Sequence, residues 1–500
     1  MSIGNVKVHC CGLEENGHCL AVEYNNETVI LDGGLSIVLY ETLIKEAQRA
    51  SYDHTQGKIF SDPTRVLAHA PILRNVNLKT VKAFCLSHEH SDHVDAVPFI
   101  YRELQKEGID PPVFSTKPAI DGLKYKFATY RLKNLPRFYS VEDPSELPKR
   151  YRAREPRYPS LFKAKIGSFT VMWIPAEHST LNAYSLAVLL PKKGDSRRMV
   201  FYSGDFKLDQ KEGRPPMHTI RELGEEHETL LICETIGVKS SGMTGVEDLM
   251  TEKLEEYLTN LDKRLILVAI RSTEVPRIHA FEEIATKLGR RIGLIGTYMT
   301  KAYEAMRKSF PGILRGDYRI FVMSKKNVKR GVQWLGDLQP KDYKKYLLLA
   351  EARMWQTYTT DFHQIMKTAA PLPQDEKHKA CMPTSEELAK TGKLEIGRDD
   401  IVIFSTTDPY TEKMRICKMH VERHVKASKA LFYPDLHISG HGQICDYRIM
   451  MEALKPKVVI PFHREKADRD LLQTYVLDYL EPKPQFFNPQ TNGTTFEWTT

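Results

Sequence analysis

The stretch Ser87-His88-Glu89-His90-Ser91-Asp92-His93 decides how this chain is interpreted. It follows an apolar run over 81–86, which predicts a buried strand, and it precedes a helical apolar repeat over 96–104. Residues two apart on extended backbone point to the same side, so His88 and His90 can bind one ion. The turn into the helix carries Asp92 and His93 toward a second point nearby. Imidazole and carboxylate ligands suit zinc, and manganese is accepted where oxygen ligands dominate, so the stretch predicts a metal site.

Three further residues stand at or just after the ends of predicted strands, as the first cluster does. They are His178, Asp205 and His463. A single histidine is more often a core or surface residue than a ligand. The shared placement of the three nevertheless favours their joining the same metal centre.

Length and composition indicate a globular chain of two or three domains. It has 500 residues, of which 41% are hydrophobic, and a formal net charge of +8. This mild basic excess suits a polyanionic partner but is common in other proteins. The first residues resemble no secretory signal, and no apolar run approaches the 18 residues of a membrane span. The eight cysteines form no disulfide framework, so we expect a cytoplasmic protein without a membrane partner.

One group near the N-terminus has two interpretations. Cys10, Cys11, His18 and Cys19 could in principle bind a metal. Their spacing is not that of a tetrahedral site and they lie in alternating, strand-like sequence. Burial within strands is therefore the favoured interpretation.

The pattern of predicted secondary structure changes along the chain. Short strands fill the first 35 residues, and the strand 29–31 runs into Asp32-Gly33-Gly34. A polar insertion covers about 35–80. From about 237, strands alternate with helices, which predicts a parallel sheet flanked by helices, and 366–397 reads as a polar excursion on its surface.

In this order these residues resemble a known family. Asp32, the His88-x-His90-x-Asp92-His93 signature, His178 and Asp205 are similar to the four sequence motifs of the metallo-β-lactamase fold. The resemblance extends to the β-CASP nucleases, and within them to ribonuclease J. It rests on the segments 203–209, His437-Ile438-Ser439-Gly440-His441 and Pro461-Phe462-His463, and on the acidic Glu234 at a strand end.

The resemblance implies an α/β fold, a metallo-β-lactamase αββα sandwich with an inserted α/β β-CASP domain. Residues 1–236 and 431–500 would form the sandwich, and 237–430 would form the insertion. Because the chain ends about 37 residues after His463, it resembles the short archaeal enzymes without the C-terminal domain of the bacterial ones. Whether it forms a homodimer is left open.

The resemblance also implies a role for each residue. His88, His90 and His178 would hold one zinc, Asp92, His93 and His463 the other, and Asp205 would bridge them. Asp92 belongs to the catalytic set as well, and Asp32 would orient ligands. His441 would be the general acid, oriented by Glu234, and Ser439 and the amides around Gly440 would bind a phosphate. For His437, support beneath the site is favoured over substrate binding.

The implied function is hydrolysis of phosphodiester bonds in single-stranded RNA. A histidine at 463 favours RNA over DNA by analogy, and the Ser-Gly-His segment favours a 5′-to-3′ exonuclease that prefers a 5′-monophosphate. Arg271, Arg277, Lys301 and 325–330 could line a backbone track, although the last is equally well a solvated loop.

The alternatives are an endonuclease of the mRNA 3′-end-processing type, a lactone or thioester hydrolase of the same fold, and a catalytically inactive RNA-binding subunit. All the expected ligands are present, which argues against a catalytically inactive subunit. Small-molecule hydrolases lack the long insertion.

Overall fold

The structure is a computed structural model. It describes residues 5–13, 17–35, 75–129, 132, 134–153, 157–180, 182–192, 194–208, 215–242, 247–259, 264–272, 274–309, 312–323, 325–351, 365, 394–406, 412–434 and 436–499. The predicted polar stretches 35–80 and 366–397 lie mostly outside these residues. The chain divides into two compact units, the first formed by 1–244 and 440–500 and the second by 245–439.

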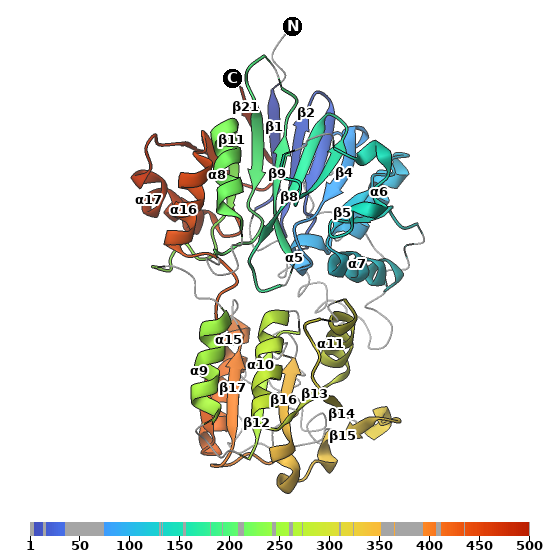
Figure 1. Ribbon diagram of the computed structural model, residues 1–500, viewed down its shortest axis with the longest axis vertical. Coiled ribbons are helices and arrows are strands. Elements are labelled where there is room, and N and C mark those ends of the chain that lie inside the picture. The colour runs from blue at the N-terminus through green and yellow to red at the C-terminus, as the bar shows by residue number, and fades with distance from the viewer. Residues whose placement is uncertain are drawn as a thin grey trace. The chain divides into compact units, whose positions relative to one another are not determined.

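The first unit contains two seven-stranded sheets (Figure 1). In spatial order, the first sheet consists of β21 (Thr494–Trp498), β1 (Val6–Gly12), β2 (Cys19–Tyr24), β3 (Glu27–Leu31), β4 (Val81–Cys85), β5 (Val113–Ser115) and β6 (Phe138–Ser140). The second consists of β20 (Gln485–Phe486), β19 (Val458–Phe462), β11 (Glu228–Glu234), β10 (Arg198–Tyr202), β9 (Ala183–Leu189), β8 (Phe169–Ala176) and β7 (Phe162–Ile166).

Three apolar layers hold this unit together. Residues from both sheets, among them Val8, Leu31 and Trp173, form the core between the sheets. The outer face of the first sheet packs against α6 (Val97–Lys106) and α7 (Lys117–Thr129). The outer face of the second packs against α8 (Met217–Glu226), α16 (Ile444–Leu454) and α17 (Lys466–Tyr475). The order helix, sheet, sheet, helix confirms the expected αββα sandwich.

The second unit contains one parallel sheet, as its alternating pattern predicts. Its strands in spatial order are β15 (Val332–Trp334), β14 (Tyr318–Val322), β13 (Arg291–Ile295), β16 (Tyr346–Glu351), β12 (Ile266–Ile270), β17 (Ile401–Ser405) and β18 (Leu431–Tyr433). The α-helices among its described residues are α9 (Glu247–Thr259), α10 (Val275–Lys287), α11 (Thr297–Ser309) and α15 (Glu412–Ala427). All five residues of β12 are buried, as expected for a central strand covered on both faces.

The boundaries of the two units differ from those expected at 237 and 430. Residues 237–242 bond to the first unit, since Gly237 donates to the Tyr447 hydroxyl and the Ser240 carbonyl accepts from Ile444. At the other boundary, β18 pairs with β17 and so belongs to the second unit.

The site-forming sequence folds as its pattern predicts. The strand expected over 81–86 is β4, and the helical repeat over 96–104 is α6. Between them lies the short α5 (Ser91–Val94), which contains Asp92 and His93. None of the helices described is both long and apolar enough to cross a membrane.

Candidate metal centre

Loops that follow strands of both sheets bring the predicted ligands together. The signature stretch follows β4 of the first sheet. His178, Asp205 and His463 follow β8, β10 and β19 of the second sheet. All seven predicted ligands fall into two groups whose ligand atoms lie within 4.8 Å of one another.

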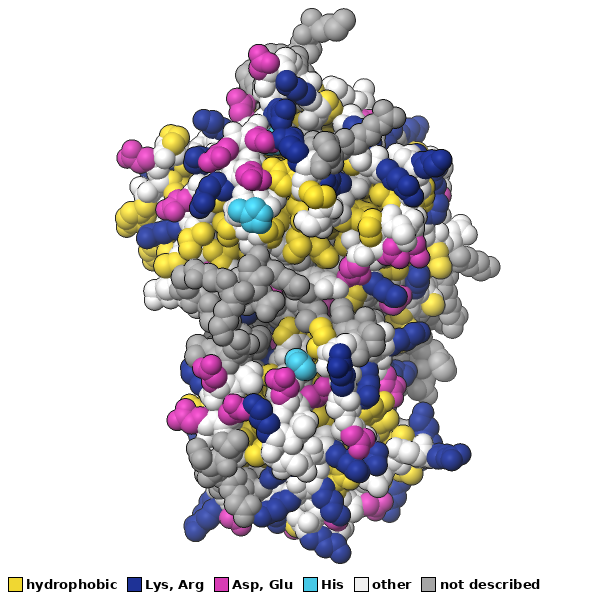
Figure 2. Space-filling model, viewed as in Figure 1, with side chains coloured by type: hydrophobic (Ala, Val, Ile, Leu, Met, Phe, Trp, Pro, Cys, Tyr) yellow, Lys and Arg dark blue, Asp and Glu magenta, His cyan; other side chains and the backbone are white. Residues whose placement is uncertain are grey.

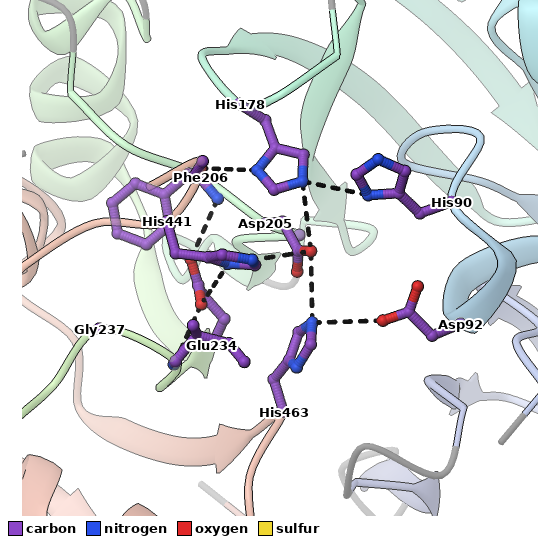
Figure 3. Close-up of polar contacts among 12 residues, drawn as sticks. His90, Asp92, His178, Asp205, Phe206, Glu234, Gly237, His441 and His463 are labelled. Atoms are coloured by element: carbon purple, nitrogen blue, oxygen red, sulfur yellow. Dashed lines mark hydrogen bonds and ion pairs between the residues drawn. The ribbon is translucent and has the colours of Figure 1, made fainter. Parts of the chain in front are cut away.

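The first group consists of His88, His90, His178 and Asp205, of which Figure 3 labels the last three. Nδ1 of His90 lies 3.0 Å from Nε2 of His88 and 3.2 Å from Nε2 of His178. Oδ2 of Asp205 lies 3.7 Å and 3.6 Å from the same two Nε2 atoms. Two ligand atoms in a tetrahedral zinc shell are about 3.3 Å apart, given bonds of about 2.0 Å, so the spacing fits a single ion.

The second group contains Asp92, His93 and His463, together with a fourth residue, His18. Asp205 contacts this group too, because its Oδ2 lies 3.3 Å from Nε2 of both His93 and His463. Oδ2 of Asp92 lies 3.9 Å and 3.6 Å from the same two nitrogens. Asp205 therefore stands between the two groups, as the resemblance implies.

The Asp32 carboxylate lies beneath the second group and is fully buried. Its Oδ1 accepts from the Ser87 amide, and its Oδ2 accepts from the Ser87 and Tyr202 hydroxyls and from Nδ1 of His93, each at 2.7 Å. Because Nδ1 of His93 donates to this carboxylate, the lone pair of Nε2 faces the group. Asp32 has a φ of 58°, which aspartate tolerates better than most residues.

Two other histidines are oriented in the same way. Nδ1 of His88 lies 3.0 Å from the Ser87 hydroxyl, and Nδ1 of His178 donates to the Gly440 carbonyl at 2.6 Å. A Cβ at position 440 would lie 2.8 Å from the Ser179 amide nitrogen and 2.9 Å from the His178 ring. Only glycine allows this backbone to approach the ring so closely.

His441 lies beside the two groups and is held by Glu234 (Figure 3). Its Nδ1 is 3.1 Å from Oε2 of Glu234 and 3.9 Å from Oδ2 of Asp205. The Glu234 carboxylate is fully buried and also accepts from the amides of Phe206 and Ile236, both at 3.2 Å. Glu234 thus fixes the ring of a histidine that is still 15% exposed.

The protonation states of the buried histidines and carboxylates favour binding of cations at this site. Burial lowers the pKa of His88 and His178 well below the ordinary value, so both are neutral and able to bind a metal. Burial also opposes charge on His93, but the nearby carboxylates of Asp205, Asp32 and Asp92 raise its pKa overall. The raised pKa of His93 reflects the negative charge of the carboxylates around it, which a metal ion would balance.

Several buried nitrogen and oxygen atoms of the site also lack hydrogen bonds among the residues described. They are Nε2 of His93, Nδ1 of His463, Oδ1 of Asp205 and both ring nitrogens of His18. Buried polar atoms are normally satisfied. Orphaned imidazole and carboxylate atoms beside two converging groups fit a metal centre better than a purely structural cluster.

His18 is the residue that reasoning from sequence misplaced. The three cysteines grouped with it are buried on β1 and β2, as the strand interpretation predicts. His18 instead precedes β2, and its ring centroid lies 3.9 Å from that of His463. Burial lowers its pKa to about 3. The signal available in the sequence was a histidine directly after Gly17, in a loop between two strands.

The predicted substrate-binding residues fall in different units. Gly440 lies in the first, whereas His437 and Ser439 lie in the second, so their roles stay predictions. Nδ1 of His437 contacts the Arg277 guanidinium, which also pairs with Glu274 at 2.7 Å. Arg277 is only 1% exposed, so the expectation that it lines a surface track is wrong, because it is engaged inside the second unit.

The other basic positions differ in exposure, and Arg271 is half-buried. Lys301 and the run 325–330 are exposed, and Lys325 lies over the Trp334 ring. On the face shown in Figure 2, basic and acidic side chains are interspersed rather than gathered by sign. The net charge of +8 is thus not concentrated on that face.

Comparison with known proteins finds relatives named ribonuclease J. The chain is 24% identical over 473 residues to ribonuclease J of Pyrococcus abyssi. The aligned region covers 93% of this chain and 90% of that relative. It is 26% identical over 469 residues to ribonuclease J of Methanocaldococcus jannaschii, and this alignment covers 90% of the chain and 89% of the relative. No family model matches the chain.

A solved structure supports the fold alone. A protein of unknown function from Enterococcus faecalis V583 aligns with 99% of this chain and all of its own, with a TM-score of 0.58 and 14% identity. The shared fold therefore extends across both units.

Proposed function

We propose that this chain, which is related to ribonuclease J over more than nine-tenths of its length at 24% identity, is a metal-dependent ribonuclease. The observation that carries the proposal is the convergence of all seven predicted ligands on two adjacent points that share Asp205. Relatives named ribonuclease J support RNA as the substrate. The proposed substrate is single-stranded.

The proposed centre holds two zinc ions. His88, His90 and His178 would hold one, Asp92, His93 and His463 the other, and Asp205 would stand between them. Imidazole is the main ligand type in both groups, which favours zinc over manganese or magnesium. Asp32, Ser87 and the Gly440 carbonyl would keep the imidazoles oriented, since each accepts from a ring nitrogen that faces away from the ions.

When bound, two such ions supply an acidic water and stabilise charge on the phosphate oxygens. The chain itself supplies the proton for the leaving 3′-oxygen. His441 would deliver it from Nε2, because Nδ1 is engaged by Glu234. Glu234 would hold the ring in position for the transfer, and a positioned acid of this kind contributes about 10²- to 10⁴-fold.

The finer proposal is a 5′-to-3′ exonuclease that prefers a 5′-monophosphate. It rests on the likeness of the segment 437–441 to the family's phosphate-binding motif. The close packing of Gly440 against His178 supports it, because it holds the Gly440 backbone beside the metal groups. Ser439 and the amides around Gly440 would bind the terminal phosphate.

The test offers 5′-labelled single-stranded RNA with a monophosphate, a triphosphate or a hydroxyl, beside circular RNA and DNA of matched sequence. Zinc-loaded and manganese-loaded protein, chelated protein and His441→Ala are compared. His279→Ala is the matched control, because His279 is a partly exposed histidine paired with Glu283 in the second unit.

Mononucleotide release from the monophosphate RNA, lost with chelator and in His441→Ala but kept in the control, is the expected result. Cutting of the circle would establish an endonuclease instead. Cleavage of no nucleic acid with either metal would overturn the proposal and leave esters and lactones as substrates to test.

A further inference from the structure

His18 is a histidine at the metal centre to which the resemblance gives no role. Its side chain is fully buried, and neither ring nitrogen has a hydrogen-bond partner in the part of the chain that the structure describes. A neutral imidazole buried in this way loses its bonds to water, and its contact with Asp92 at 3.6 Å is longer than an ordinary hydrogen bond. Such a position is costly unless something else binds the ring.

The ring lies among the second group of ligands. Its Nε2 is 3.6 Å from Oδ2 of Asp92, a separation like those between the ligand atoms of the first group. Its ring centroid lies 3.9 Å from that of His463 and 4.7 Å from that of His93. One ligand atom from each of the four residues fits within 4.8 Å.

The backbone holds His18 in this position. Its amide donates to the Asp92 carbonyl at 2.6 Å, and its carbonyl accepts from the Gly34 amide at 2.8 Å. The preceding Gly17 has a φ of 96°, and a Cβ there would lie 2.5 Å from the Gly34 carbonyl oxygen. Backbone bonds to α5, which contains Asp92, and to the loop after Asp32 therefore hold His18 at the centre.

Buried histidines elsewhere in the described chain have partners. The ring nitrogens of His9 lie 2.9 Å from the Thr495 hydroxyl and 3.1 Å from the Glu23 carboxylate. Nδ1 of His227 lies 3.0 Å from the Leu223 carbonyl. A histidine with a merely structural role would be expected to bond in the same way.

We propose that His18 is an additional ligand of the ion held by Asp92, His93 and His463. The inference rests on the two-metal centre proposed above and extends it. Each ion would then have three imidazoles, and the second would also have Asp92 and the shared Asp205. A third imidazole shifts the preference of this position further toward zinc or cobalt and away from manganese.

The experiment measures metal affinity rather than activity. Wild type, His18→Gln and His9→Gln are stripped and titrated with zinc against a chromophoric chelator, and cobalt(II) loading is followed by absorption. His9→Gln is the matched control, since it removes a buried imidazole from the same sheet. Circular dichroism and thermal unfolding verify that each variant folds.

We expect His18→Gln to bind one zinc as tightly as wild type and the other about 10- to 100-fold more weakly. The loss should be larger for zinc than for manganese, and His18→Asp should recover part of it by supplying a carboxylate. Wild-type affinity at both positions in His18→Gln, with an unchanged cobalt spectrum, would overturn the inference.

Two further outcomes are informative. If wild type itself binds fewer than two ions, the two-metal centre fails rather than the role of His18. If His18→Gln does not fold, proton NMR of cobalt-loaded wild type counts the metal-bound imidazoles from their shifted N–H signals. Six histidines are expected with His18 as a ligand, and five would refute it.

Discussion

Replacing Asp32 by asparagine tests whether an inner carboxylate sets the geometry of the second metal position. Asparagine suits the φ of 58° as well as aspartate does and keeps one acceptor for the Ser87 amide. Its amide nitrogen, however, would replace Oδ2, which accepts from the Ser87 hydroxyl, Tyr202 and His93. The change removes a charge and three acceptor contacts without changing size.

The magnitude follows from which donors stay unsatisfied. A buried donor without a partner costs about 1–3 kcal/mol. His93 can lose its proton, whereas the buried hydroxyls of Ser87 and Tyr202 are left facing an amide nitrogen. We therefore expect a loss of about 3 kcal/mol in the free energy of unfolding. Loss of the partner that orients His93 should weaken one metal position about 10- to 100-fold.

Chelator competition and urea denaturation measure the two effects separately. Asp95→Asn is the matched control, because Asp95 is a buried carboxylate two residues after His93 that pairs with Lys126 instead of a ligand. The control should lose stability and keep its metal affinity. Unchanged zinc affinity in Asp32→Asn, with activity intact, would show that Asp32 does not orient His93 and would refute the reasoning.

Four other changes have distinct signatures. Asp205→Asn should lose affinity for both ions, as measured by metal content after dialysis, because Asp205 contacts both groups; loss of a single ion would contradict its shared position. Glu234→Gln should keep both metals but lower kcat up to about 10²-fold by loosening the position of the proton donor His441, with KM unchanged. Gly440→Ala should destabilise the fold by about 1–3 kcal/mol, seen in urea denaturation, because the added Cβ meets a metal-binding ring. Burial lowers the pKa of His227, so the folded protein resists protonation of this residue, whereas the unfolded chain takes up a proton below about pH 6.5. The free energy of unfolding should therefore fall as pH drops through that range, by at most about 1.4 kcal/mol per pH unit, and less steeply in His227→Gln. Equal slopes in wild type and variant would exclude this role of His227.

The metal groups could be predicted because local sequence determines where their ligands lie. His88 and His90 alternate at the end of a buried strand, and α5 begins directly after them, so their convergence needs no distant contact. His178, Asp205 and His463 follow strands of one sheet, and loops at one edge of a sheet meet. Strand ends identified from apolar runs therefore favoured one centre for these ligands, whereas their division into two sets came from the family resemblance.

Other features depend on contacts between distant segments, which the sequence pattern does not report. His18 reaches the centre through backbone bonds to Asp92 and Gly34, and these form only when the first sheet is assembled. Arg277 lies on an amphipathic helix and reads as a surface cation, but Glu274 and His437 engage it inside the second unit. A charged residue with its partner one helical turn away is ambiguous until the packing is known.

His463 shows a second way of orienting a ligand. Its Nδ1 has no hydrogen-bond partner among the residues described, whereas Nδ1 of His88, His93 and His178 each has one. Its backbone instead has a φ of 80°, rare for a residue with a side chain, and its amide donates to the Leu13 carbonyl at 2.6 Å. Such a conformation costs about 1–3 kcal/mol and persists only where the surroundings enforce it. The strand end and the Leu13 contact do so here, and the ring is thereby aimed at Asp205, where a metal ion would recover the cost.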